Sequence, residues 1–337
     1  MKASEQKSQT VIYLAAIVII LAGMKVAAPL IVPFLLAMFI AIISAPLLIW
    51  LNKYHVPTGL SILLIMGIFI FLGISLSSLI GESIGQFYQN IPTYSEKLQQ
   101  LQLGLLSKIN SYGIPVDISA INHFLDPKKA MTMIGSVFSS LSNVLTNTFL
   151  ILFFVVFILM EASSLPEKAR EAFGAETQSI EKFQQFSDSV KKYLIIKSLV
   201  SLGTGLCAWV CLELLGVDYP ILWGLLAFLL NFIPTIGSIL AAIPPMLLAL
   251  VQIGFGAALG VAVSYLIINT VFGNLVEPKV MGRTLGMSAF VVFTSLVFWG
   301  WLLGPVGMLL SIPLTMVFKI AMDNSKDYHW IAVLLDK

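Results

Sequence analysis

Charged residues are scarce in this sequence. Asp, Glu, Lys and Arg make up 11% of its 337 residues, whereas an ordinary soluble domain has about 25%. Hydrophobic residues make up 58% of the chain, and its mean hydropathy is +0.96. A soluble fold of this length would need far more charge to cover its surface. The apolar excess must therefore face lipid, and the sequence predicts an integral membrane protein.

Several residues and motifs that catalysis or nucleic-acid binding would need are also missing. There is no Gly-Lys dipeptide, so the chain has no Walker A loop, and there is no His-Glu-x-x-His zinc motif. The net charge of +2 gives no basic field for nucleic acid. Cys207 and Cys211 lie four residues apart in an apolar run, where we expect small hydrophobic side chains on one helix face. We therefore predict no enzyme activity, no metal, no cofactor and no nucleic-acid partner.

Long apolar runs divide the chain into eight segments, judged against the roughly 20 residues that a membrane helix needs. Residues 11–51 hold two predicted spans joined near Pro29–Pro33, since proline disfavours helix continuation. The other apolar segments are 59–80, 141–160, 194–215, 220–250, 256–273 and 288–319. This pattern predicts an all-α polytopic membrane protein with about six full spans and two interrupted, re-entrant helical hairpins.

Two polar segments set the predicted domain organisation. Apolar residues recur every three or four positions from Ile80 to Leu105, which is typical of an amphipathic helix. This extracytoplasmic arm either caps its own protomer or contacts another subunit. The predicted domains are spans 1–3 in 1–80, the arm in 81–140, span 4 with a cytoplasmic helical segment in 141–193, a transport region in 194–319 and a cytoplasmic tail in 320–337.

The distribution of Lys and Arg predicts sidedness, because cytoplasmic loops are enriched in positive charge. With the N-terminus in the cytoplasm, the arm lies outside and the C-terminus inside. If the two longest apolar segments are simple spans, the loop 274–287 with Lys279 and Arg283 lies outside. If they are hairpins that enter and return, that loop lies inside, and about 14 of the 19 Lys and Arg residues are cytoplasmic. Charge therefore favours the hairpins.

The two longest segments are interrupted at similar places. Each has about 30 residues, too long for one untilted span at 1.5 Å per residue, and each has a proline–glycine tip near its middle. Backbone groups freed by such a break must be buried in protein or line a wet cavity, and paired breaks indicate a transporter's substrate site. Ordinary proline-kinked helices are the alternative. The predicted pathway residues are Asn231, Pro234, Thr235 and Gly237 in the first segment, Pro305 and Gly307 in the second, and Asn269 between them.

The densest polar cluster of the membrane region lies between these segments and consists of Asn269, Asn274, Glu277, Lys279 and Arg283. In a plain solvated turn these residues would only cap helix ends. Against the hairpin tips, Asn274, Glu277 and Arg283 become candidates for gating or ion coupling. A charge at the bilayer centre costs about 2.5–3.5 kcal/mol on insertion scales. The neutral amides of Asn231 and Asn269 therefore suit a site for a polar solute better than Glu277 does.

Three stretches, Trp223–Pro245, Asn269–Gly286 and Phe298–Pro313, resemble the signature regions of the autoinducer-2 exporter family of permeases. The similarity extends from Pro33–Ala37 to Ile331–Leu335 and so covers essentially the whole chain. It implies export of autoinducer-2, a small borate-binding furanone signal, across a bacterial inner membrane. It also implies a homopentamer in lipid whose paired hairpins move in elevator fashion.

Two rival hypotheses remain beside the exporter. Other members of the family are credited with sodium–proton antiport, so a monovalent cation–proton antiporter that uses Glu277 or Glu213 is the first. The membrane region, however, lacks the aspartate pairs usual for such coupling. The second is a membrane scaffold whose arm binds partners, but a scaffold has no need of wet breaks in its helices.

The hairpin hypothesis predicts that the loop 274–287 is cytoplasmic, because positive charge is retained on that side. A cysteine placed at Thr284 should react with an impermeant thiol reagent from the cytoplasm, and one at Ser111 in the arm from outside. Labelling of intact cells and of inverted vesicles measures this, in a chain whose Cys207 and Cys211 are replaced by alanine. Reaction of both positions from one side would exclude the hairpins.

Overall fold

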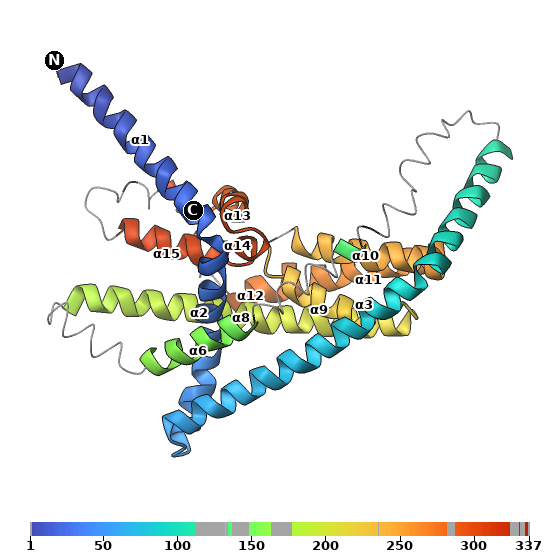
Figure 1. The fold of residues 1–337 in the computed structure, drawn as a ribbon, viewed down its shortest axis with the longest axis horizontal. Helices are drawn as coiled ribbons and strands as arrows, with labels where there is room; N and C mark the ends of the chain where they lie inside the picture. The colour runs from blue at the N-terminus through green and yellow to red at the C-terminus, as the bar shows by residue number, and fades with distance from the viewer. Residues whose placement is uncertain are drawn as a thin grey trace. The chain divides into compact units, whose positions relative to one another are not determined.

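The chain is helical throughout the part that a computed structural model describes. These residues are 2–111, 132, 134–136, 148–162, 177–234, 236–281, 287–323, 330 and 334–335, and none of them forms a strand. The all-α prediction is confirmed. Figure 1 shows these helices. They belong to two compact units: unit 1 comprises residues 1–66, 149–195 and 283–337, and unit 2 comprises 67–148 and 196–282.

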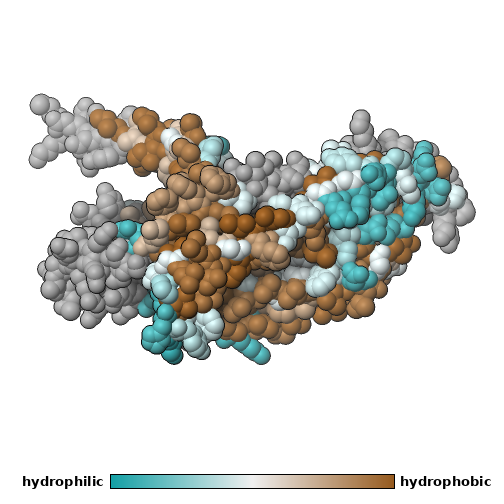
Figure 2. Space-filling view, turned by 60° about the horizontal axis from the view of Figure 1, so that its bottom comes forward, coloured by the Kyte–Doolittle hydropathy of each residue, from teal (hydrophilic) through white to brown (hydrophobic). Residues whose placement is uncertain are grey.

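Four helical stretches among the described residues are long and apolar enough to cross a membrane: Ala28–Lys53, Thr58–Leu101, Asp188–Leu214 and Phe255–Met281. Large apolar side chains such as Leu63, Phe71 and Phe149 are exposed on the helices. Apolar residues accordingly cover much of the coloured surface in Figure 2. Such surface is unfavourable in water, so these faces are suited to lipid.

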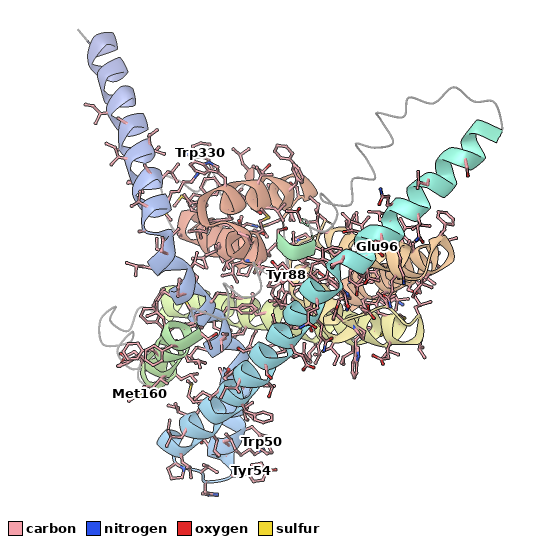
Figure 3. The ribbon with its side chains drawn as sticks, turned by 45° about the vertical axis from the view of Figure 1, so that its right-hand side comes forward. Trp50, Tyr54, Tyr88, Glu96, Met160 and Trp330 are labelled. Atoms are coloured by element: carbon pink, nitrogen blue, oxygen red, sulfur yellow. The ribbon has the colours of Figure 1, made fainter. Side chains whose placement is uncertain are left out.

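Unit 1 begins with α1 (Lys2–Val26) and α2 (Ala28–Lys53), which meet at Ala27. The sequence placed this junction near Pro29–Pro33, but Pro33 lies inside α2. Pro29 occupies the first turn of α2, where a backbone N–H would have no acceptor within the helix, so proline costs no hydrogen bond there. Trp50 and Tyr54 lie at the other end of α2 (Figure 3), with ring centroids 4.9 Å apart. Such aromatic pairs are typical of a membrane–water interface.

Two further parts of unit 1 pack against α2. One is α6 (Thr148–Ala162), whose Phe154 ring meets Phe34 of α2 edge to face at 5.7 Å. The other consists of α13 (Ala289–Leu303) and α14 (Pro305–Leu309), and α15 (Ser311–Asp323) packs in turn against these two helices.

The chain folds back on α13 at Gly304, which has a φ of 71° and lies between α13 and α14. Trp299 of α13 donates its indole N–H to the Thr315 hydroxyl of α15 at 2.9 Å. A methyl group added at Gly300 would lie 2.7 Å from the Met308 side chain, so α14 packs closely on α13. An interruption is thus present in the second long segment, at the position that the sequence indicated.

The arm of unit 2 continues from a predicted span without a break. Helix α3 (Thr58–Ser111) has 54 residues, or about 80 Å at 1.5 Å per residue, more than twice the roughly 30 Å of a hydrocarbon core. Its predicted apolar face is observed, since Ile80, Phe87, Tyr94 and Leu98 are buried. Tyr88 and Glu96, labelled in Figure 3, are exposed.

Unit 2 is otherwise built around the second half of one long helix, α8. The elements are α8 (Thr177–Leu214), α9 (Pro220–Leu230), α10 (Gly237–Gln252), α11 (Phe255–Asn269), the π-helix η1 (Thr270–Val276) and α12 (Glu277–Met281). The predicted boundary at residues 193 and 194 therefore falls inside a continuous helix.

Helix α9 runs antiparallel to α8. A methyl group added at Gly224 would lie 2.8 Å from the Gly205 carbonyl oxygen, so the two backbones are nearly in contact. Further along, Asn231 at the end of α9 bonds Ser201. The contacts thus run forward along α9 and backward along α8. The two helices can approach so closely because glycines lie at their crossing.

Helices α9 and α10 form a closed antiparallel hairpin (Figure 1). At its base, the Gln252 side chain donates to an Asp218 carboxylate oxygen at 2.9 Å and accepts from the Asp218 backbone N–H at 3.0 Å. The end of α10 is therefore held beside the start of α9. With 11 residues, α9 is about 16 Å long, too short to cross a bilayer alone.

The arm is tied to the base of this hairpin. Tyr94 of α3 donates its hydroxyl to the Asp218 carboxylate at 2.6 Å, and Lys97 donates to the Gln252 carbonyl at 3.0 Å. Asn90 donates to the Tyr219 hydroxyl at 3.3 Å. These contacts favour the interpretation of the arm as a cap on its own protomer.

The loop expected at residues 274–287 is shorter than the sequence suggested. Helical structure continues from α11 through η1 and α12 to Met281, so Asn274 and Glu277 lie in a helix. In a regular α-helix, the Pro278 ring would clash with the carbonyl four residues earlier. The wider turn of η1 directly before α12 gives that ring room.

Gly237 lies at the tip of the first hairpin, where an added methyl group would overlap the Leu230 carbonyl oxygen. Gly237→Ala should therefore lower the free energy of unfolding by about 1–3 kcal/mol, as overpacking does. Gly256→Ala in α11 is the matched control, because nothing lies within 4 Å of its added methyl group. It should be neutral or stabilising by up to about 1 kcal/mol. Thermal unfolding in detergent measures both, and equal Tm values would contradict the tight turn.

Candidate functional site

Three buried polar residues lie on one face of α8. Lys197, Ser201 and Thr204, here called the polar stripe, follow one another at spacings of four and three, which places them on the same side of a helix. Thr204 donates to the Val200 carbonyl of its own helix at 3.0 Å. The other two members of the stripe bond side chains from other elements.

Ser201 meets the tip of the first hairpin. The Asn231 amide donates to the Ser201 hydroxyl oxygen at 3.0 Å, and both residues are buried. The last turn of α9 sets the position of Asn231, since its backbone N–H bonds the Ala227 carbonyl. Two neutral polar groups thus meet inside the helical unit.

Lys197 forms an ion pair with Glu277. Its ammonium donates to both carboxylate oxygens at 2.8 Å. The Lys197 side chain is only 4% exposed, whereas that of Glu277 is 20% exposed. Removing one partner from a buried pair costs about 3–5 kcal/mol, because the remaining charge stays in a low-dielectric environment. The pair therefore constrains how α8 and α12 can separate.

Glycines of α8 allow its neighbours to approach closely. A methyl group added at Gly203 would lie 2.5 Å from a ring carbon of Phe272 in η1. One added at Gly205 would lie 2.8 Å from the Phe228 side chain in α9. Helix α8 thus holds η1 and α9 close to the polar stripe.

Helix η1 is a π-helix of seven residues directly before Glu277. Such segments are rare and frequently occur at functional sites. A methyl group added at Gly273, inside η1, would lie 3.0 Å from the Asn269 side-chain oxygen. Helix η1 begins directly after Asn269 and ends directly before Glu277, so it lies between two of the predicted polar residues.

The structure brings two of the predicted residues to the polar stripe. Asn231 contacts it at Ser201, and Glu277 contacts it one turn away at Lys197. Asn269 is half-buried, and Asn274 is exposed on η1. Glu277 pairs with Lys197, and Arg283, the other charged candidate for gating or coupling, lies outside the described residues.

The remaining predicted residues are distributed over both units. Pro234 and Gly237 lie at the tip of the first hairpin, and Thr235 between them lies outside the described residues. Pro305, which is exposed, and Gly307, which is buried, belong to unit 1.

Sequence reasoning missed Lys197 and Ser201. Lys197 lies near the start of the apolar segment 194–215, four residues after the predicted cytoplasmic segment ends, and it was not selected as a site residue. The spacing of Lys197, Ser201 and Thr204 was the available signal, because it places three polar residues on one helix face within an apolar run. Such residues inside a membrane helix indicate a functional site.

A short hairpin with a buried polar tip, packed against a helix that carries a paired charge, is typical of a membrane transport protein. Comparison with known families agrees. The model of the AI-2E family transporter family matches residues 14–327, and the chain belongs to this family.

Several relatives are similar over nearly their whole length. The AI-2 transport protein TqsA of Escherichia coli is 44% identical over 325 residues, which cover 96% of this chain and 94% of that protein. Two others carry the name Putative transport protein. The one from Haemophilus influenzae is 42% identical, covering 97% of this chain and 96% of its own. YhhT of Escherichia coli is 36% identical, covering 96% and 92%.

The ion pair predicts unequal effects of single and paired substitutions. Lys197→Met should lower the free energy of unfolding by about 3–5 kcal/mol, because Glu277 is then left unpaired. Adding Glu277→Gln should restore most of that loss. Lys191→Met on the same helix is the control: its pair with Asp188 is 3.7 Å long and exposed, so about 0–1 kcal/mol is expected. Equal Tm shifts for the two lysine variants in detergent would contradict the buried pair.

Proposed function

We propose that this chain is a multi-pass inner-membrane transporter that exports a small polar signalling molecule, autoinducer-2, and has no enzyme activity of its own. Membership of the AI-2E transporter family and the similarity to TqsA support this proposal. The observation that carries it is the meeting of Asn231 with Ser201 beside the Lys197–Glu277 pair.

The depth of this polar site fits a solute pathway. Leu214, near the base of the hairpin, lies thirteen positions after Ser201 on α8, which is about 20 Å along the helix axis. The hydrocarbon core is about 30 Å thick. A hairpin that enters from the side of the arm would therefore carry Asn231 well into the bilayer, where unpaired backbone groups must face protein or a wet cavity.

The proposal includes a topology and an assembly. Both termini are cytoplasmic, the arm is extracytoplasmic, and five copies assemble in lipid with hairpins that move as elevators. The distribution of Lys and Arg supports the topology. The resemblance to the autoinducer-2 exporter family suggests the pentamer and the elevator motion.

The ion pair disfavours the rival cation–proton antiporter. A carboxylate that binds a monovalent cation needs oxygen atoms free to accept it. Both carboxylate oxygens of Glu277 already accept hydrogen bonds from Lys197 at 2.8 Å, so the lysine ammonium occupies the place of the cation.

Efflux of labelled autoinducer-2 from proteoliposomes tests the proposed function, with and without sodium and pH gradients. Solute efflux that requires the wild-type protein would support an exporter. Sodium-dependent proton movement without efflux of the signal would instead support the antiporter.

Asn231→Leu should lower the efflux rate at least about tenfold, because it removes a hydrogen bond and places an apolar group in the polar site. Asn90→Leu is the control, since it also removes one amide hydrogen bond, to Tyr219 at the base of the hairpin. It should leave the rate within about twofold. Equal rates for both variants, at equal protein levels, would remove Asn231 from the pathway.

A further inference from the structure

The two partners of the buried ion pair differ in how firmly they are held. Lys197 lies on α8, where Ser201, Thr204, Ala208 and Leu212 are buried as well. Glu277 lies at the start of a five-residue helix in which only Met281 is buried, and the preceding η1 has no buried residue. Segments with few buried contacts open at lower free energy than well-packed ones. Separation of the pair would therefore move Glu277 and leave Lys197 in place.

A separated pair leaves a buried cation that needs a new partner. The Lys197 side chain is 4% exposed, so water cannot solvate its ammonium well, and an unpaired charge there is strongly unfavourable. Among the groups that could take the place of the carboxylate, one with negative charge compensates the ammonium directly. A neutral hydroxyl or amide would offer a hydrogen bond but would leave the charge uncompensated.

Neutral polar groups lie next to this cation. Ser201 follows Lys197 by one turn of α8, and Asn231 bonds it from the hairpin tip. A ligand anion on Lys197 would therefore have a hydroxyl one turn further along α8, about 5.4 Å along the helix axis, and the amide that bonds this hydroxyl. That set of groups matches a small solute that carries an anionic oxygen group together with hydroxyls.

We propose that Lys197 is a solute-binding residue, on which the anionic oxygen group of the transported solute replaces the Glu277 carboxylate during each cycle. The inference rests on the proposed function and adds to it a charge preference: the anionic form of the solute is carried, and Glu277 holds the site while it is empty. Glu277 thus occupies, in the empty site, the position on Lys197 that the anionic group of the solute takes when it binds.

The test compares two charge forms of one solute. Boric acid converts a neutral vicinal diol into a borate ester anion, so autoinducer-2 with and without boric acid supplies both forms. KM and Vmax for efflux from proteoliposomes are measured for the wild-type chain and for Lys197→Met/Glu277→Gln, which removes both charges together. Lys197→Gln/Glu277→Gln is measured in parallel, because two amides can bond each other if the first pair assembles poorly.

The matched control is Asp188→Asn/Lys191→Met, which removes an exposed ion pair from the same helix. Lys197→Arg keeps the positive charge and should retain the borate effect. A purely structural role of the pair would leave the charge preference unchanged in every variant that assembles.

In the wild-type chain and in the control, boric acid should lower KM about tenfold or more, the effect of one charge-assisted hydrogen bond. In both neutral double variants this difference should disappear, with KM for the anionic form raised to that for the neutral form. Equal KM values for the two forms in the wild-type chain would overturn the inference, as would a borate effect that persists in the double variants. A wild-type chain that transports neither form would contradict the proposed function itself.

Discussion

Hydrocarbon offers no hydrogen-bond partner to a peptide group, and this constraint governs the whole fold. Helices satisfy their own backbone, so the apolar runs become helices wherever local sequence allows. Where proline and glycine break the runs, as at Pro234–Gly237 and Gly304–Gly307, the freed groups must be covered by protein. The chain meets this need by folding each interruption back on a neighbouring helix. In unit 2 the hairpin packs against α8 at Gly205, and Gln252 closes its base on Asp218.

The Lys197–Glu277 pair matters for the same reason, because hydrocarbon cannot solvate a charge. A charge among apolar helices must be neutralised in every state that the protein visits. The pair joins α8 to the segment after η1, and one turn away Ser201 joins α8 to the hairpin tip. Movement of the segment after η1, or of the hairpin tip, therefore changes the surroundings of Lys197. A polar site built in this way links solute binding to the packing of three elements.

Local pattern predicted several elements well. The apolar period of α3 marked the face that buries Phe87 and Tyr94, and the proline and glycine positions marked both interruptions. Local pattern failed where two signals competed. The polar residues from 274 onward suggested a loop, but helical structure continues through the π-helix η1 to Met281. Lys197 lay within the apolar segment 194–215 but was not selected, because a single lysine in an apolar run does not show which side chain it meets.

The sequence by itself determined the class of protein, the helices and the places where they break, since these follow from apolar content, periodicity and the backbone chemistry of proline and glycine. The tertiary structure alone decided which polar groups meet. Glu277 lies 80 residues from Lys197, and Asn231 lies 30 residues from Ser201. Pairing over such separations depends on how α8, α9 and η1 pack, and that packing follows from glycine contacts between helices. No local pattern encodes such a contact, because its energy belongs to two distant segments together.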